Sequence, residues 1–536
     1  MTSDSGDHGS LWEQNQSAGS LSRSPLERDE KADVCVVGAG IAGLSVAYQL
    51  SRAGLSVVVL EDGSIGGGET GHTTAHLSNA WDDRYSLAEA VHGERGAALI
   101  AESHTAAIDE IERTVIDEGI RCDFLRLDGF LFPHPGEDPD ALGEELEAAH
   151  RAGLSGVEWL DALPLIDFPV RQPCLRFPSQ GQFHPLRYLS GLADAIQRRG
   201  GKIFTGAHAA KISAGAPCEV GIESGPIVRA QHVVVATNSP VHLRFAMHTK
   251  QSAYRTYAIG ARVSQGAIPR GLYWETGSPY HYVRLQPRDD ADARGSEILI
   301  VGGEDHKTGQ AADDEQFVRL EAWMRLHFPK AGEVEFRWSG QVMETVDGAA
   351  YIGRSPDDER LLLVTGDSGM GMTHGTIAGL LLADLIQGRD HPWASLYDPS
   401  RKSLRASGEF LKENLNVAKR YGDRLKGGTA ESVDAIDPGQ GAILRVDGRQ
   451  LAVYRDRRGE LQACTAICPH LGCVVQWNHH ERSWDCPCHG SRFDPHGRVL
   501  NGPANQDLDR ESPPARGEAP ALSNTNTNTN ANRERA

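Results

Sequence analysis

The sequence predicts an α/β domain of the doubly wound kind, joined to an α+β domain and followed by a small all-β domain. A strand, a glycine-rich turn, a helix and a second strand follow one another within residues 33–61. Short strand-like segments surround two loops rich in cysteine and histidine within residues 433–510. The length of 536 residues exceeds one ordinary domain and allows about two to four.

The first strand, residues 33–37, ends in a G-x-G-x-x-G turn made of Gly38, Ala39, Gly40, Ile41, Ala42 and Gly43. A helix-like stretch to Arg52 follows, and the second strand, residues 56–60, ends at Glu61. Such a turn lets backbone N–H groups approach a pyrophosphate at the positive end of the helix. Glu61 is placed to accept a hydrogen bond from a ribose 2′-OH, and an acid there disfavours a 2′-phosphate.

A glycine-rich segment further on indicates which dinucleotide binds. Residues 66–75 read Gly-Gly-Gly-Glu-Thr-Gly-His-Thr-Thr-Ala and resemble the second flavin-contacting loop of the D-amino-acid oxidase superfamily, which includes sarcosine and glycine oxidases. Residues 181–187, the strand-like residues 233–238 and the glycine-rich turn after residues 361–366 are similar to further landmarks of that family. The resemblance implies FAD as the cofactor.

The resemblance also implies a domain organisation. Residues 32–395 would form a FAD-dependent oxidoreductase domain of the Rossmann-like, doubly wound kind. Within it, residues of about 76–178 and 240–345 would build the substrate subdomain, from helical patterns in the first segment and strands in the second.

Two glycine-rich segments of the family lie against the flavin. The resemblance therefore implies cofactor contacts from Thr70, Gly71, His72, Thr73, Gly366, Gly369, Gly371, Met372 and Thr373. A helix that begins after the second segment would point its N-terminus at the pyrimidine end of the ring, where a helix dipole and backbone donors stabilise the charge of a reduced flavin.

His72 has two interpretations. In the dimethylglycine-dehydrogenase branch, a histidine in a similar Gly-x-Thr-x-His context carries the flavin covalently, and residues 68–72 fit that spacing. The alternative is a histidine that packs in the loop or donates a hydrogen bond to the pyrophosphate.

The strand-like residues 280–284 are similar in position to a family strand that often supplies an arginine for a substrate carboxylate. Arg284 would clamp a carboxylate with two hydrogen bonds, with Tyr282 nearby. Strand alternation places Tyr280, Tyr282 and Arg284 on one face. The alternative is an amphipathic strand with a solvated arginine, and Arg255 and His374 are further candidates.

The two loops near the C-terminal end read Cys-Pro-His-Leu-Gly-Cys at residues 468–473 and Cys-Pro-Cys-His-Gly-Ser at residues 486–491. Two thiolates on one iron and two imidazoles on the other are the ligands of a Rieske [2Fe–2S] centre. Cys and His at short spacing also bind zinc, but a zinc site leaves the extra cysteine pair unexplained.

The loops resemble the Rieske domain family over residues 433–510. The resemblance implies a [2Fe–2S] cluster with the ligands Cys468, His470, Cys486 and His489, and a disulfide between Cys473 and Cys488. Residues 502–504 would be the proline loop that covers the cluster.

Two neighbouring residues bear on the cluster's potential. Ser491 keeps the hydroxyl that bonds a bridging sulfide in respiratory relatives, but Phe493 stands where many of them have tyrosine. Hydrogen bonds to cluster sulfurs raise the potential, so we expect a potential below that of the tyrosine-bearing proteins.

The rest of the chain is polar. Residues 1–31 and the low-complexity residues 511–536 are predicted to be disordered, because they cannot bury enough apolar surface. The polar, partly helical residues 396–432 are predicted to be a linker.

Charge and composition restrict the partners and the compartment. A net charge of −19 at pH 7, without a cluster of basic residues, argues against nucleic acid or an anionic membrane as a partner. We find neither a secretory signal nor the ~20 apolar residues that a membrane span requires. We expect a cytoplasmic protein, in which the disulfide would be an exception to the reducing compartment.

Together these features predict a flavin-dependent oxidoreductase. It would oxidise a small-molecule amine or amino-acid-like donor at FAD and pass electrons singly through the cluster to an external acceptor. The alternative is an electron-transfer or redox-sensing protein without its own turnover. A Rieske oxygenase is disfavoured, because it needs a mononuclear iron held by two histidines and a carboxylate and usually lacks the second cysteine pair.

Overall fold

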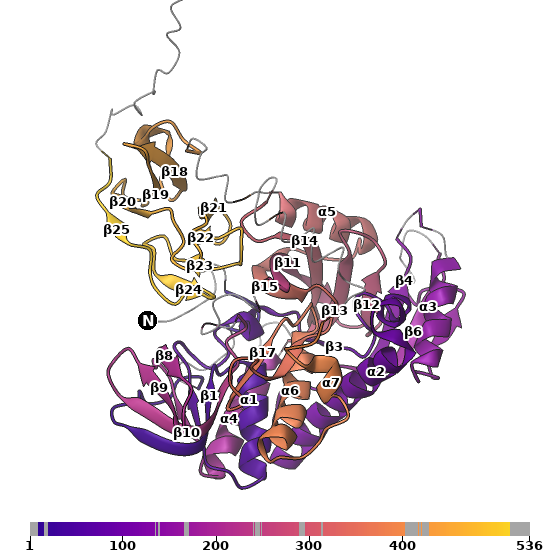
Figure 1. The fold of residues 1–536 in the computed structure, drawn as a ribbon. Helices are drawn as coiled ribbons and strands as arrows, with labels where there is room; N and C mark the ends of the chain where they lie inside the picture. The colour runs from indigo at the N-terminus through magenta and orange to yellow at the C-terminus, as the bar shows by residue number, and fades with distance from the viewer. Residues whose placement is uncertain are drawn as a thin grey trace, which may run out of the picture.

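The computed structural model describes residues 9–14, 20–134, 136–137, 140–165, 171–239, 241, 247, 249–288, 295–311, 315–402, 416, 420 and 428–514. Most of the predicted linker and nearly all of the predicted C-terminal tail lie outside these residues. Two large sheets build the main body, and a domain of two small sheets lies against it (Figure 1). The arrangement agrees with the fold class that the sequence predicts.

The first large sheet is parallel at its centre, where β1 (Glu30–Val37) pairs with β2 (Val57–Leu60) and with β10 (Ile227–Val235). The order continues outward to β7 (Lys202–Phe204) on one side and to β17 (Leu361–Thr365) and β16 (Tyr351–Arg354) on the other. A hairpin of β8 (Ala209–Ser213) and β9 (Cys218–Ile222) adds to β10.

Strand β1 shows why this part of the sequence is continuously apolar. Val34 and Val36 belong to the core shared with the helices, whereas Cys35 and Val37 belong to a second core under the β8–β9 hairpin. Both faces of the strand are therefore buried, as in other parallel sheets. The sequence from Val34 to Val37 is continuously apolar for this reason and does not alternate between apolar and polar residues.

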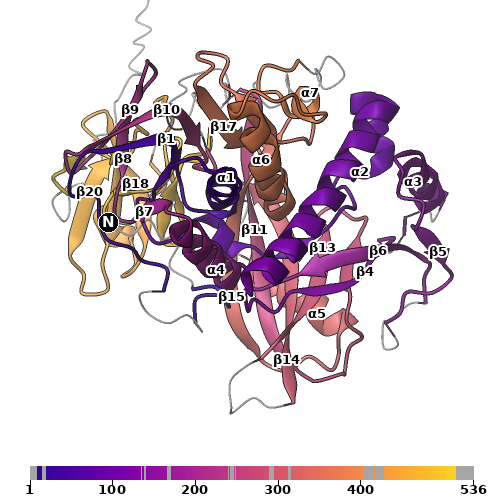
Figure 2. The ribbon, with the colours of Figure 1, turned by 90° about the horizontal axis from the view of Figure 1, so that it is seen from below.

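The helices α1 (Ile41–Arg52), α4 (Pro185–Arg198) and α6 (Gly371–Ile386) lie together, with the long α2 (Tyr85–Glu118) beside them (Figure 2). Close packing of α1 on α6 requires glycine, because a Cβ atom on Gly379 would lie 2.8 Å from the carbonyl oxygen of Ser45. This contact holds the two glycine-rich turns that precede α1 and α6 next to each other.

The second large sheet has nine strands, and α5 (Gln316–His327) packs against it. Two separate parts of the chain build this sheet, and they meet where β12 runs parallel to β4. The earlier part gives β3 (His76–Leu77), β4 (Leu125–Phe132), β5 (Glu158–Leu160) and β6 (Cys174–Gln182), together with α3 (Asp140–Arg151). The later part gives β11 (Gln251–Ser264), β12 (Leu272–Glu275), β13 (His281–Pro287), β14 (Ser296–Lys307) and β15 (Val334–Thr345).

The N-terminal segment differs from the prediction of disorder. The indole of Trp12 is fully buried, and its Nε1 donates a hydrogen bond of 2.6 Å to the carbonyl of Thr73. Its ring lies against His184, with 5.1 Å between the ring centroids, and 5.3 Å from the guanidinium of Arg284. A polar segment cannot form a core of its own, but one aromatic side chain can dock it on a core formed by other elements.

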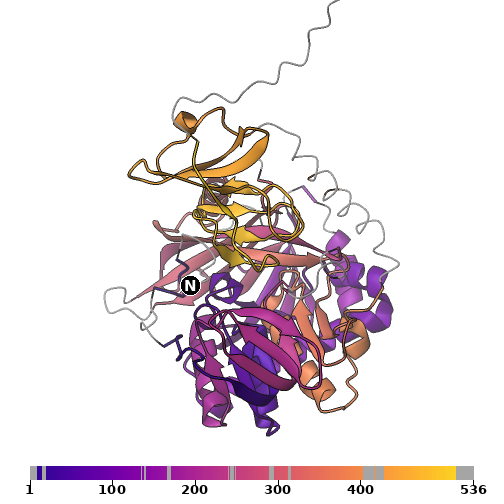
Figure 3. The ribbon, with the colours of Figure 1, turned by 60° about the vertical axis from the view of Figure 1, so that its left-hand side comes forward.

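The small domain consists of two four-stranded antiparallel sheets and lies on one side of the main body (Figure 3). One sheet contains β18 (Gly441–Val446), β19 (Arg449–Arg455), β20 (Leu461–Thr465) and β25 (Arg510–Glu511). The other contains β21 (Gln476–Asn478), β22 (Ser483–Asp485), β23 (Arg492–Phe493) and β24 (Val499–Asn501).

The residues that the structure describes also form the short helices η1 (Glu69–His72), α7 (Ala394–Tyr397) and η4 (Val433–Ala435). Within the described part of the chain, every helix is too short or too polar to cross a membrane.

Candidate functional site

A cavity of about 340 Å³ lies between the two large sheets and reaches the small domain. Most of the residues that the sequence predicts as cofactor contacts line it: Gly38, Gly40, Ile41, Ala42, Glu61, Thr70, His72, Thr73, Gly369, Gly371, Met372 and Thr373. Ala39, Gly43, Gly71 and Gly366 are not among the lining residues. Gly43 instead allows the turn itself, because a Cβ atom there would overlap the carbonyl oxygen of Gly38.

One end of the cavity has the features of a dinucleotide site. Gly38 has a φ of +103°, and a side chain there would collide with the backbone of Ala236. The Glu61 carboxylate accepts hydrogen bonds from the N–H groups of Ala39 (2.7 Å) and Gly63 (3.0 Å). Burial and the neighbouring Asp62 raise the pKa of Glu61. A glycine cradle at the start of a helix, with a carboxylate at the end of the next strand, fits the diphosphate and ribose of FAD.

The loop with η1 connects this end to the rest of the cavity. The Thr70 hydroxyl accepts a hydrogen bond of 3.1 Å from the first N–H of α1, at Ile41. His72 is buried in the cavity wall, with its Nδ1 3.2 Å from the carbonyl oxygen of Gly68. The carbonyl of His72 also accepts a hydrogen bond from the indole of Trp338. The loop is therefore fixed both to α1 and to the second sheet.

The turn before α6 forms the opposite wall. The Asp367 carboxylate accepts a hydrogen bond from the N–H of Met343, and the carbonyl of Asp367 lies 2.9 Å from Nδ1 of His374. Burial lowers the pKa of His374 to about 4, so the ring is neutral at physiological pH. Because α6 begins at Gly371, which lines the cavity, the positive end of its dipole is directed toward the site.

Arg284 does not lie where the sequence predicts a substrate clamp. It is fully buried, and its Nη1 donates to the carbonyls of Ala75 (2.8 Å) and Thr74 (3.1 Å). Tyr280 and Tyr282 line the cavity, but Arg284 does not. The alternation of β13 is as predicted, yet Arg284 lies further along the strand, beneath the loop that contains Thr74. Burial lowers its pKa to about 9.

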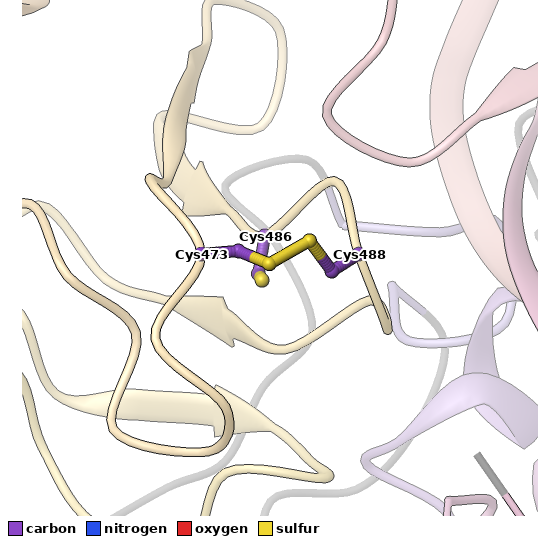
Figure 4. Close-up of side chains that lie close together, drawn as sticks. All are labelled: Cys473, Cys486 and Cys488. Carbon is purple, nitrogen blue, oxygen red and sulfur yellow. A yellow bond between two sulfur atoms is a disulfide. The ribbon is translucent and has the colours of Figure 1, made fainter. Parts of the chain in front are cut away.

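In the small domain, Cys473 and Cys488 form a disulfide with a Cα–Cα distance of 6.4 Å. The sulfur of Cys486 lies beside it, within 4.8 Å of both sulfur atoms (Figure 4). Because Cys473 and Cys488 are bonded to each other, their sulfurs are not available as thiolate ligands.

The four predicted cluster ligands form two pairs. The thiol of Cys486 is in hydrogen-bond contact with Cys468, and this contact lowers the pKa of Cys468. The rings of His470 and His489 lie 5.0 Å apart between centroids and are nearly perpendicular. Two adjacent sulfurs and two adjacent imidazoles fit a two-iron centre with one pair on each iron. The Ser491 hydroxyl accepts a hydrogen bond of 2.9 Å from the N–H of Ala504, which fixes the covering loop.

The end of the small domain that carries these loops faces the main body. Gln341 donates from its side chain to the carbonyl of Gly490 (3.0 Å), and Gln310 donates to that of Pro487 (3.0 Å). Asn501 donates to the carboxylate of Glu69 in η1 (2.7 Å). Six residues of the covering loop and its surroundings line the cavity: Val499, Leu500, Asn501, Gly502, Ala504 and Asn505.

A buried network of charges holds the two parts together. Arg255 on β11 bonds to Ser339 and lies 3.3 Å from the carboxylate of Glu481 in the small domain. Arg492 lies 3.2 Å from Asp485 and 3.7 Å from Glu481. The side chains of both arginines and both acids are at most 1% exposed. No local pattern in the sequence marks Arg255 for this interface, because the same strand carries a second arginine, Arg262, and several other polar residues.

Comparisons with known proteins agree with this geometry. The model of the family "FAD dependent oxidoreductase" matches residues 33–385, and that of the Rieske [2Fe-2S] domain matches residues 429–512. The putative Rieske 2Fe-2S iron-sulfur protein YhfW of Bacillus subtilis (strain 168) is 30% identical over 493 residues, which cover 90% of this chain and 94% of that protein.

Two further similarities cover about two thirds of the chain. The gamma-glutamylputrescine oxidoreductase of Escherichia coli (strain K12) is 28% identical over 373 residues, 68% of this chain and 85% of that protein. Glycine oxidase from Geobacillus kaustophilus has the same fold, with a TM-score of 0.57 and 19% identity over 70% of this chain and 99% of that chain.

Proposed function

Because the chain belongs to the FAD-dependent oxidoreductase family and carries a Rieske [2Fe-2S] domain, we propose that it oxidises an amine or amino-acid-like donor and passes the electrons through the cluster to an external acceptor. In this proposal residues 32–395 form the FAD-dependent part, and residues 433–510 hold the cluster through Cys468, His470, Cys486 and His489. The acceptor takes electrons one at a time, because the cluster transfers them singly.

The reaction balances as R–CH₂–NH₂ + H₂O → R–CHO + NH₃ + 2 e⁻ + 2 H⁺. FAD supplies a two-electron acceptor for the hydride from the carbon, and the cluster supplies one-electron transfer. In this proposal the donor binds in the cavity, which the chain's own residues line. Imidazole ligation raises the potential of the cluster above that of an all-thiolate cluster, so transfer away from the flavin is favourable.

One observation carries the proposal: Gln341 lies between the cavity and the cluster-binding loop. It lines the cavity, its backbone N–H donates to Glu69 of η1, and its side chain donates to Gly490, the neighbour of His489. A cluster domain that served only as a separate structural unit would not need its ligand loops against the flavin cavity.

The similar proteins support the donor class. By its name, the Escherichia coli relative is an oxidoreductase of gamma-glutamylputrescine, which is an amine, and the solved structure with the same fold is a glycine oxidase. The similarity to the Bacillus subtilis protein covers both parts of the chain.

An anaerobic titration tests the proposal. Amines and amino acids are added to iron-replete protein while the flavin absorbance and the EPR signal of the reduced cluster are recorded. We expect the flavin to bleach with a donor and the cluster signal to follow. Bleaching without a cluster signal would refute the electron route. If dithionite reduced both centres and no donor reduced either, the electron-transfer or sensor function would replace the proposal.

A further inference from the structure

The end of the cavity remote from the dinucleotide turn is walled by the nine-stranded sheet. Five neighbouring strands or their ends contribute side chains to it: Thr256 from β11, Trp274 from β12, Tyr282 from β13, Asp305 from β14 and Glu344 from β15. This wall belongs to the sheet that the sequence assigns to the substrate subdomain. The donor therefore lies against these side chains if the proposed function holds.

Carboxylates are concentrated in this wall. Asp82 hydrogen-bonds to Tyr280. Asp82 also lies close to the turn before α6, because a Cβ atom added to Gly369 would be only 2.7 Å from its Oδ2 atom. Asp305 hydrogen-bonds to Thr256, whose hydroxyl lies 2.7 Å from that of Tyr282. The Oδ1 atom of Asp305 is buried without a hydrogen-bond partner. This carboxylate oxygen beside the cavity can therefore accept a hydrogen bond from a group that the protein does not supply.

The described residues that line the cavity include no lysine and no arginine. The two arginines that the sequence offered as carboxylate clamps have other partners, since Arg284 bonds to backbone carbonyls and Arg255 to Ser339 and Glu481. A donor carboxylate would therefore meet no cationic side chain among the described lining residues, whereas an ammonium group would meet carboxyl groups whose ionised form it stabilises.

The electrostatics of the two aspartates agree with a missing cation. Enclosure by the protein and the charges of Asp83 and Asp305 raise the pKa of Asp82 to about 8. Enclosure also raises the pKa of Asp305 to about 6, and the charge of Glu304 adds to this effect. A positive charge in the cavity would stabilise both carboxylates in their ionised form.

Aromatic rings complete the surroundings. Trp274, Tyr280 and Tyr282 all line the cavity, and the two tyrosine rings lie 5.4 Å apart between centroids. Aromatic faces beside carboxylates recognise alkylammonium groups, because the ring quadrupole attracts a cation.

We propose that the donor is a cationic amine without a carboxylate near the reacting carbon, such as a diamine. In this proposal Asp82, Asp305 and Tyr280 hold the ammonium group at the end of the donor that does not react. The inference rests on the proposed function and narrows its donor class. The chemistry is the balanced oxidation given above, and the wall selects the donor by charge.

A matched series of donors tests the inference on the holoenzyme. 1,4-Diaminobutane, butylamine and 4-aminobutanoate have the same chain length and differ at the distal end, which is an ammonium, a methyl or a carboxylate group. We expect anaerobic flavin reduction with a KM at least about tenfold lower for the diamine than for butylamine, and the poorest reduction with 4-aminobutanoate. A preference for 4-aminobutanoate, or for 2-aminobutanoate over butylamine, would overturn the inference and leave the proposed function standing.

Equilibrium binding gives a second readout that needs no turnover. Calorimetry should detect tert-butylammonium, which has N–H groups to donate but no C–H on the carbon beside the nitrogen and therefore cannot be oxidised, and it should not detect acetate. Asp305→Asn should weaken this binding at least about tenfold, and Asp82→Asn provides a second variant if the first loses its flavin. Asp109→Asn, which changes an exposed aspartate on α2, serves as the control and should bind as the wild type does.

The calorimetric result separates the two claims. If no donor reduces the flavin but tert-butylammonium binds and Asp305→Asn abolishes binding, the proposed function fails and the cation site stands. Binding of acetate in preference to tert-butylammonium, or binding of neither ion, would refute the cation site.

Discussion

Arg284 is a buried cation that donates hydrogen bonds to the backbone of the loop of residues 66–75 and to the side chain of Gln286. We predict that Arg284→Met destabilises the protein by about 2–4 kcal/mol, because it leaves the carbonyls of Thr74 and Ala75 buried without this donor. It should also weaken FAD retention, while the KM of the remaining holoenzyme for donors should stay close to that of the wild type. Thermal unfolding and the ratio of flavin to protein absorbance measure both effects.

Arg262→Met is the matched control, since Arg262 is 56% exposed and pairs with Glu335. A fully flavinated Arg284→Met protein with a raised KM only for carboxylate-bearing donors would restore the role that the sequence predicts for Arg284.

Phe493 is a second residue with a direct test. It is fully buried in β23, and Ser491, two residues before it, already bonds to the covering loop. Phe493→Tyr adds a hydroxyl of the kind that donates to cluster sulfurs in respiratory relatives, so the reduction potential should become more positive. An EPR-monitored redox titration measures the change. An unchanged potential in a protein with an intact cluster would contradict the prediction.

At the scale of elements, Trp12 docks the N-terminal segment on the loop of residues 66–75. The indole contacts Thr73, His184 and Arg284, which belong to three separate parts of the fold. We predict that Trp12→Ala lowers the free energy of unfolding by about 3–5 kcal/mol, as for other buried tryptophans. Denaturant unfolding measures the loss. Trp159→Ala, at a tryptophan that is 38% exposed, should cost much less, and equal losses would contradict the docking of the segment.

The two glycine-rich turns are also a property of elements rather than of single residues. They lie close together because α1 and α6 pack at glycine positions, as the contact between Gly379 and Ser45 shows. Their sequences predict what each turn binds, and the helix packing decides that both contribute to one cavity.

At the scale of the whole molecule, the small domain is docked by buried charges. Breaking such a network by removing one partner costs about 3–5 kcal/mol, because the remaining charge stays buried without compensation. We therefore predict that Glu481→Gln loosens the small domain and slows cluster reduction after flavin reduction. Hydrogen exchange should increase in residues 486–491, which contact the main body in the wild type.

Glu158→Gln, at a surface carboxylate that pairs with Arg176, is the control for charge removal. It should change neither the rate of cluster reduction nor the hydrogen exchange of residues 486–491. Unchanged exchange in residues 486–491 of Glu481→Gln would show that the charge network does not hold the domain in place.

The sequence by itself determined the two cofactors, and most of the cofactor contacts that it predicts line the cavity. Ligand loops such as residues 468–473 and 486–491 and the turn at residues 38–43 are short, and the chemistry depends on residues only a few positions apart. Local backbone geometry then places the cluster ligands and the backbone N–H groups of the turn, with little dependence on the rest of the chain. The fold class followed for the same reason, since its strands and helices are visible in local patterns.

Only the tertiary structure decided what surrounds the site. Glu69 bonds to Asn501, 432 positions away, and Arg255 meets Glu481 on another domain. Strand alternation put Arg284 on the predicted face, but the packing of the flavin loop over β13 decided that its guanidinium meets carbonyl groups instead of the cavity. The acidic wall with Asp82 and Asp305 likewise exists only because separate strands and a loop converge. Such contacts depend on how distant segments pack, and no local pattern in the sequence encodes that packing.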